Sequence, residues 1–129
     1  MKLKTLRPML WTEQFTGTIE FYTTTLGFVC DERNDEWEWA SLHKDDVAIM
    51  VARPNAQTIF EKPVFTGSFY INTEDVDVLW DHLKGKVNVA YHIETFEWGM
   101  REFAIYDNNG YLLQFGQDVQ ETQQAFEPI

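Results

Sequence analysis

The order of predicted elements in this chain occurs twice, and this repetition restricts the possible fold more than any other feature. A strand, a helix and three further strands are predicted before residue 54, and the same order returns after residue 65. The stretch WASLHKDDVAIMV in the first half matches EFAIYDNNGYLLQF in the second, which is typical of a duplicated unit. We therefore expect an α+β fold of two tandem β-α-β-β-β modules, with curved mixed sheets around a groove and helices on the outer face.

The boundaries of the repeat divide what we expect to be a single domain, since 129 residues suit one domain. Module one covers about residues 3–53, a proline-containing linker covers 54–65, and module two covers about 66–117. The polar segment 118–129 is predicted to be a surface tail.

The spacing of apolar residues in module one changes from a helical period to a strand period. Gly27 follows the predicted helix directly, at the position where C-terminal helix caps favour glycine. The predicted elements are a helix with its apolar face at Phe15, Ile19, Tyr22 and Leu26, and strands over Leu3–Trp11, Phe28–Glu32, Glu36–His43 and Val47–Arg53.

Module two repeats this change of period. Thr73 is predicted to cap its helix, and Gly85 follows the predicted end. The predicted elements are a helix with its apolar face at Val76, Leu79, Trp80 and Leu83, and strands over Gly67–Ile71, Val87–Ile93, Met100–Asp107 and Tyr111–Phe115.

Charge and composition disfavour several classes of protein. The formal net charge of −11 disfavours nucleic-acid binding, which needs a basic surface. This acidic field suits a cationic ligand, and solubility explains it equally well. No segment has the roughly 20 apolar residues of a membrane helix, so we expect a cytoplasmic protein with no membrane partner. Cys30 is the only cysteine, which excludes an internal disulfide, and we expect it to be buried.

Side-chain alternation along the predicted strands selects the residues that face the groove. Broad aromatic side chains mixed with polar tips suit a flat, amphipathic ligand. An alternative is that the tryptophans seal a dimer interface. The predicted groove residues are Trp37, Trp39 and Met50 in module one, and Glu102, Tyr106 and Gln114 in module two.

Glu102 is costly to bury without a partner. Alternation predicts that Arg101 points to the opposite face of the strand, which disfavours a direct pair between the two. The partner of Glu102 is then either Arg101 or a cation on the ligand.

Four stretches carry a resemblance to a known family: IEFYTTTLGF at 19–28, INTEDVDVLWDHL at 71–83, WGMREFAIYDNNG at 98–110 and DNNGYLLQF at 107–115. Together with the repeat, they resemble the vicinal oxygen chelate superfamily, which includes glyoxalase I, extradiol dioxygenases, fosfomycin-resistance enzymes and bleomycin-resistance proteins. The third stretch is similar to the Trp-Gly-x-Arg-Glu-Phe segment of the bleomycin-resistance branch. The resemblance covers roughly Leu3 to Gln117 and implies the same two-module fold.

The resemblance also implies four metal-ligand positions, one on each of four strands, in the metal-dependent members of the superfamily. In this sequence those positions are matched by Arg7, Met50, Thr66 and Gln114. Arginine cannot ligate a divalent cation, methionine is a soft thioether and threonine is a poor neutral ligand. The departure from the pattern predicts a chain without metal or other cofactor, and it argues against glyoxalase, dioxygenase and fosfomycin-transferase activity.

Three functions follow as hypotheses. The first is a metal-free homodimer, similar to bleomycin-resistance proteins, that binds an antibiotic-like aromatic or cationic compound in a groove between subunits. Its predicted contacts are Trp37, Trp39, Met50, Trp98, Glu102, Tyr106 and Gln114. The second is a glyoxalase-type lyase or isomerase with an altered metal site, for which the sequence marks no catalytic residue. The third is a structural or regulatory partner without a small ligand.

Overall fold

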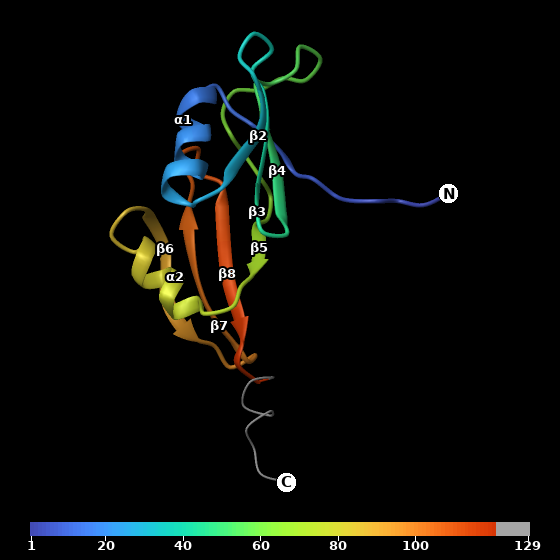
Figure 1. The fold of residues 1–129 in the computed structure, drawn as a ribbon. Helices are drawn as coiled ribbons and strands as arrows, with labels where there is room; N and C mark the ends of the chain where they lie inside the picture. The colour runs from blue at the N-terminus through green and yellow to red at the C-terminus, as the bar shows by residue number, and fades with distance from the viewer. Residues whose placement is uncertain (121–129) are drawn as a thin grey trace. The chain divides into compact units, whose positions relative to one another are not determined.

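The computed structural model describes residues 1–120, which divide into two compact units at the boundary between Val64 and Phe65. Each unit contains a four-stranded mixed sheet and one main helix (Figure 1). The two-module α+β fold expected from the repeat is thereby confirmed. None of the helices in residues 1–120 is long and apolar enough to cross a membrane.

The first unit contains a sheet with strand order β1-β4-β3-β2. Strand β1 pairs with β4 in parallel, and the remaining pairs are antiparallel. The elements are β1 (Met9–Trp11), α1 (Phe15–Glu20), the π-helical turn η1 (Phe21–Thr25), β2 (Val29–Asn34), β3 (Trp39–Lys44) and β4 (Val47–Ala52).

The second unit repeats this topology with strand order β5-β8-β7-β6. Strand β5 is parallel to β8, and the other two pairs are antiparallel. The elements are β5 (Phe69–Asn72), α2 (Val76–Leu83), β6 (Asn88–Thr95), β7 (Met100–Tyr106) and β8 (Leu112–Asp118).

The helix of each module buries the apolar face that its spacing predicts, except that Leu79 of the second helix is only partly buried. In module one, Phe15, Ile19, Tyr22 and Leu26 are all buried. The last turn widens into η1, where the amide of Leu26 donates to the carbonyl of Phe21 at 3.2 Å. In module two, Trp80 of α2 packs its ring against Phe103 with centroids 5.1 Å apart, and Val76 and Leu83 are buried.

The cores confirm the side-chain alternation predicted for the central strands. The two sets of core side chains are alike in chemistry, and burying them supplies most of the free energy that holds each sheet to its helix. The buried side chains include Ala40, Leu42, Ile49 and Val51 in module one and Phe103, Ile105, Leu113 and Phe115 in module two.

Several predicted boundaries are wrong for identifiable reasons. Strand β1 starts at Met9 rather than Leu3, because Pro8 has no amide hydrogen with which to extend a ladder. Strand β3 starts at Trp39 rather than Glu36, since Glu38 adopts a left-handed φ of 52° that ends the regular alternation.

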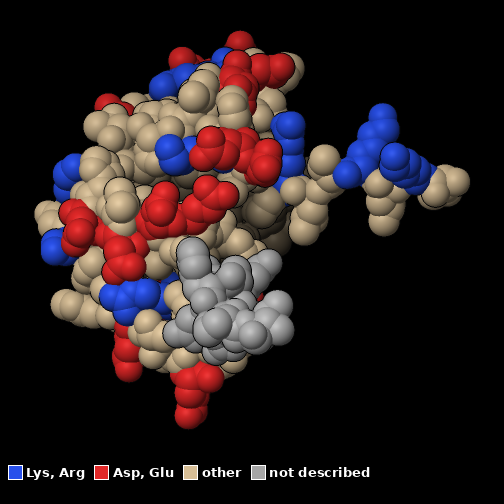
Figure 2. Space-filling model, turned by 60° about the horizontal axis from the view of Figure 1, so that its bottom comes forward, with Lys and Arg blue, Asp and Glu red and all other residues tan. Residues whose placement is uncertain are grey.

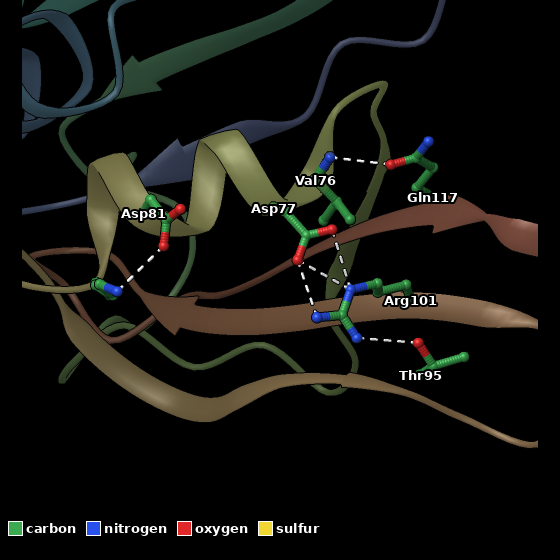
Figure 3. Close-up of polar contacts among 7 residues, drawn as sticks. Val76, Asp77, Asp81, Thr95, Arg101 and Gln117 are labelled. Atoms are coloured by element: carbon green, nitrogen blue, oxygen red, sulfur yellow. Dashed lines mark hydrogen bonds and ion pairs between the residues drawn. The ribbon is translucent and has the colours of Figure 1, made fainter.

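The start of α2 also differs from the prediction. Thr73 donates its hydroxyl to the carbonyl of Glu74 and does not cap the helix. The first helical amide, that of Val76, instead donates to Oε1 of Gln117 on β8 at 3.0 Å (Figure 3). A side chain from strand β8 therefore accepts the hydrogen bond that a local capping residue was expected to accept.

Two other predictions need correction. Cys30 is partly exposed rather than buried, because it lies on the edge strand β2; burial nevertheless raises the pKa of its thiol. Strand β8 extends to Asp118, the first residue of the predicted tail, because its last residue pairs with Met100 of β7. Residues 121–129 of that tail lie outside the described part of the chain.

Candidate functional site

The strongest candidate site lies on the face of the module-two sheet that points away from α2. Glu102 and Ala104 alternate on β7 with the buried residues Phe103 and Ile105, so their side chains project from the face opposite the helix. The register places Gln114 of β8 beside Ala104. Tyr70 of β5 lies next to Gln114 in turn.

Glu102 is the centre of this face. Only 3% of its surface is exposed, yet its carboxylate accepts hydrogen bonds from three aromatic side chains. Oε1 accepts from the hydroxyl of Tyr70 at 3.1 Å and from the indole nitrogen of Trp98 at 3.3 Å. Oε2 accepts a short hydrogen bond from the hydroxyl of Tyr91. None of the ion pairs within residues 1–120 includes Glu102.

Two further side chains extend the arrangement toward the sheet edge. Nε2 of Gln114 donates to the hydroxyl of Tyr91 at 2.8 Å, and Oε1 of Gln114 accepts a short hydrogen bond from the hydroxyl of Ser68. We refer to the connected side chains as the Glu102 network. Its members are Ser68, Tyr70, Tyr91, Trp98, Glu102 and Gln114.

The two tyrosines of the network act as hydrogen-bond donors over a wide pH range. Burial, followed by the hydrogen bond to Glu102, raises the pKa of Tyr70 to about 12. Burial is also the largest cause for Tyr91, and with the bond to Glu102 it raises the pKa of that phenol to about 12. Both phenols therefore hold their protons at neutral pH and point them at the carboxylate.

Local irregularities of the backbone allow these side chains to meet. The ladder between β6 and β7 shifts register on each side of Tyr91, and bulges of this kind turn a side chain away from its regular direction. On β8, Gly116 leaves room for Tyr70 to reach across, because a Cβ atom at that position would collide with the Tyr70 hydroxyl. Both features help to bring the side chains of the Glu102 network together.

The turn between β6 and β7 adds an aromatic surface beside the carboxylate. Phe96 and Trp98 stack with centroids 4.6 Å apart and planes 5° from parallel, and Tyr91 meets the edge of Phe96 at 5.9 Å. Gly99 closes the turn with φ of 89°, a conformation that favours glycine. Trp98 is 59% exposed, so its indole is accessible to a ligand.

Arg101 lies on the other face of β7, as alternation predicts. Its guanidinium forms an ion pair with Asp77 on α2 at 2.9 Å and donates to Thr95 on β6 at 3.0 Å (Figure 3). This pair raises the pKa of Arg101 and lowers that of Asp77. Arg101 thus fixes the strand to the helix, and Glu102 does not have it as a partner.

The predicted site residues of module one do not form a comparable arrangement. Trp37 is 67% exposed in the turn before β3 and was expected on the strand. Trp39 and Met50 lie on the sheet face opposite α1, where the register places Met50 between Ser41 and Met9. Tyr106, the remaining predicted contact in module two, is exposed at the end of β7.

The positions that the superfamily uses for a metal do not fit one in this chain. Arg7 directs its guanidinium to Ser41 at 3.2 Å, beside the thioether of Met50, and Gln114 already engages both atoms of its amide. Thr66 is exposed and precedes β5 rather than lying on it. A guanidinium, a thioether and an occupied amide do not make a ligand set for a hard divalent cation. Residues 1–120 contain no group of three or more His, Cys, Asp or Glu side chains that could hold a metal ion.

Sequence reasoning missed three members of the Glu102 network: Ser68, Tyr70 and Tyr91. Two of these lie on short or irregular elements, where a period of two gives no guidance. A usable signal was present in the strand predicted over Gly67–Ile71, where Tyr70 is a large side chain with a polar tip among small and apolar residues.

Acidic side chains predominate on the face drawn in Figure 2. This distribution agrees with 21 acidic and 10 basic residues in the sequence. Such a surface raises the local concentration of cations and lowers that of anions. The long-range field therefore has the same sign as the buried carboxylate.

The chain matches the model of one protein family over residues 5–115, that of the Glyoxalase/Bleomycin resistance protein/Dioxygenase superfamily. No curated protein matches. Among solved structures, a glyoxalase/bleomycin resistance protein/dioxygenase from Nocardioides is similar with a TM-score of 0.73 and 16% identity, covering 93% of this chain and 87% of that one.

Two other similar structures have different printed names. TioX from Micromonospora sp. ML1 has a TM-score of 0.69 at 16% identity, with 88% of this chain and 95% of that chain covered. A lactoylglutathione lyase from Agrobacterium tumefaciens has a TM-score of 0.68 at 13% identity, with 91% and 95% covered. Identities this low establish a shared fold and leave activity open.

Proposed function

The chain belongs to the Glyoxalase/Bleomycin resistance protein/Dioxygenase superfamily, and we propose that within it the protein is a metal-free binding protein for a small molecule. The ligand is a flat aromatic or cationic compound, held without chemical change, as in the bleomycin-resistance branch. The observation that carries this proposal is the Glu102 network, a buried carboxylate surrounded by three aromatic hydrogen-bond donors. Sites for organic ligands combine such aromatic surfaces with a few polar groups.

In this proposal the face of the Glu102 network forms one wall of a groove that a homodimer completes. Trp98 and Phe96 supply the stacking surface, and Glu102 and Gln114 supply polar contacts. Trp37, Trp39, Met50 and Tyr106 remain predicted contacts. The residues at the four metal-ligand positions support binding over catalysis. A lyase or isomerase of the glyoxalase type needs a Lewis acid, and these residues do not suit a metal ion that could act as one.

The first test is metal content and ligand binding of the purified full chain. We expect substoichiometric divalent metal by elemental analysis, and quenching of tryptophan fluorescence by members of a panel of flat aromatic compounds. Replacing Trp98 by Phe should remove most of the quenching, whereas Trp11→Phe in module one should leave it in place. Light scattering after size-exclusion chromatography measures the predicted dimer.

A stoichiometric metal whose removal by a chelator abolishes a lyase or isomerase activity would favour the enzyme instead. A complete absence of binding across the panel, with a folded protein by circular dichroism, would favour a structural or regulatory partner. Either result contradicts the binding proposal.

A further inference from the structure

The carboxylate of Glu102 has an electrostatic requirement that its protein partners do not fulfil. Its three neighbours, Tyr70, Tyr91 and Trp98, donate hydrogen bonds but carry no positive charge. Burying a carboxylate without a counter-charge costs free energy even when neutral donors surround it. A cation placed on this face would offset that cost.

The hydrogen bonds also show which partner a ligand can replace. Trp98 donates to Oε1 at 3.3 Å, beyond the usual upper limit of about 3.2 Å for such a bond, and its side chain is the most exposed of the three. Tyr70 is held in the gap above Gly116, and Tyr91 is held by both Glu102 and Gln114. A ligand N–H group can take the place of the indole N–H with the smallest loss of existing structure.

Aromatic surface lies directly beside this acceptor. The stacked pair of Phe96 and Trp98 presents rings at the same turn, and cations bound near an indole gain from its quadrupole. A planar ligand that carries charge on N–H groups satisfies both features at once. A quaternary ammonium offers the charge without the hydrogen-bond donor.

We propose that the ligand class is a planar aryl cation with N–H donors, of the amidinium or guanidinium type, whose N–H group replaces Trp98 as the donor to Oε1 of Glu102. This inference rests on the proposed binding function and narrows it to one chemistry. It also excludes anionic organic compounds as ligands of this face, because a carboxylate or phosphonate would lie against the buried charge of Glu102.

The test compares four probes of one size on the full chain at pH 7: benzamidinium, benzamide, phenyltrimethylammonium and benzoate. Affinities are measured by NMR titration and by tryptophan fluorescence. We expect benzamidinium to bind at least about tenfold more tightly than benzamide or phenyltrimethylammonium, because benzamide lacks the positive charge and phenyltrimethylammonium lacks the N–H donor, and each of these contributions exceeds one tenfold step. Benzoate should be the weakest of the four.

Glu102→Gln should reduce benzamidinium affinity by at least about tenfold, to the level of benzamide, because the amide keeps the shape of the side chain and removes its charge. The matched control is Glu74→Gln, which removes the same charge at an exposed position just before α2. An exposed charge contributes little, so affinity should change by less than about threefold.

The outcomes of these titrations either support or overturn the cationic ligand class. Equal binding of benzamidinium and benzamide by the native protein overturns the inference, and this comparison does not depend on the folding of any variant. Equal losses in Glu102→Gln and Glu74→Gln overturn it as well, since they reduce the effect to long-range charge. If only flat neutral or anionic compounds bind, the proposed binding function stands and the proposed cationic ligand class is refuted. If no compound binds, both the binding function and the ligand class are refuted.

Discussion

The two modules share a fold and a register but carry opposite chemistry on the sheet face that points away from the helix. The hairpins align so that Trp39 of β3 corresponds to Glu102 of β7, and Ala52 of β4 to Gly116 of β8, because each pair is joined in its own ladder. By the same register, Met9 and Met50 in module one correspond to Tyr70 and Gln114 in module two. Module one thus has an indole and two thioethers at the positions where module two has members of the Glu102 network.

The difference separates the residues that the fold requires from those that are free to differ between the modules. Positions that face the helices are apolar in both modules, since they supply the burial that any copy of this unit needs. Positions on the opposite face are under no such requirement, and there the copies have diverged. Within the described residues, only module two has a buried carboxylate surrounded by aromatic donors, and this is why the proposed binding site is assigned to that half of the duplication.

The largest loss of stability is expected from substitutions in the two cores, where the modules are alike. Leu42 and Ile105 occupy corresponding core positions, and both are fully buried. Replacing either by Ala should lower the free energy of unfolding by about 2–5 kcal/mol, from lost burial and the cavity left behind. Chemical denaturation of the two variants measures this. A loss below about 1 kcal/mol in one of them would show that the corresponding cores differ in packing.

A smaller loss of stability, unequal between the two modules, is expected at the corresponding residues Gly116 and Ala52. Gly116→Ala introduces a Cβ atom that collides with the Tyr70 hydroxyl, and overpacking of this kind costs about 1–3 kcal/mol. Ala52→Gly, the reciprocal change, should cost only about 0.5–1 kcal/mol, from backbone entropy. Both are measured by denaturation. Equal costs would mean that Tyr70 moves aside freely, which would contradict its place in the Glu102 network.

The sequence predicted the shared part of the modules well and the divergent part incompletely. Alternation placed Phe103 and Ile105 toward the helix and Glu102 away from it, because regular strands obey a period of two. The same rule failed at Trp37, where the left-handed backbone of Glu38 intervenes. It also gave no indication of Tyr91, which lies between two register shifts.

The missed residues have a common physical cause. Tyr70 and Tyr91 join the site through bonds to residues 32 and 11 positions away in the chain, and no local pattern encodes such contacts. Gly116 has the same property, since its role is to leave space for a side chain from another strand. Functional sites are where local rules and tertiary requirements part.

The polar network should contribute moderately to stability, and its contribution should be lost at high pH. Tyr91→Phe removes a donor to Glu102 and the acceptor of Gln114, which should cost about 1–3 kcal/mol. The control Tyr106→Phe, at the exposed end of β7, should stay within about 0.5 kcal/mol of the native protein. Equal stabilities of the two variants would show that the network is not formed.

The pH dependence follows from the raised pKa values of Tyr70 and Tyr91. Both are raised from 10.0 to about 12 in the folded protein, so their contribution is complete below pH 10 and is lost as the pH rises toward 12. Absorbance titration of tyrosinate should show phenols that ionise only near pH 12, and Tyr91→Phe should remove one of them. Ionisation of every phenol near pH 10 would contradict the network.

The smallest loss of stability is expected from breaking the ion pair between Arg101 and Asp77. Module one has no corresponding ion pair among its described residues. Glu38 precedes Trp39 where Arg101 precedes Glu102, so module one has an acidic residue in the turn before β3 in place of the guanidinium. Asp77 is largely exposed, and Asp77→Asn should therefore cost no more than about 1 kcal/mol at pH 7. Asp81→Asn on the same helix, which loses only the exposed contact to Lys84, should cost about 0–0.5 kcal/mol.

The sign of the acid response separates this pair from a simple change in helix charge. Arg101 holds the pKa of Asp77 below its ordinary 3.8, so the stabilisation is present above that pH and is lost as the pH falls through the lower folded-state value. Native protein and Asp77→Asn should differ in denaturation midpoint at pH 7 and converge in strong acid. A difference that persists at pH 2, or one that equals the effect of Asp81→Asn at pH 7, would mean that Arg101 does not anchor β7 to α2.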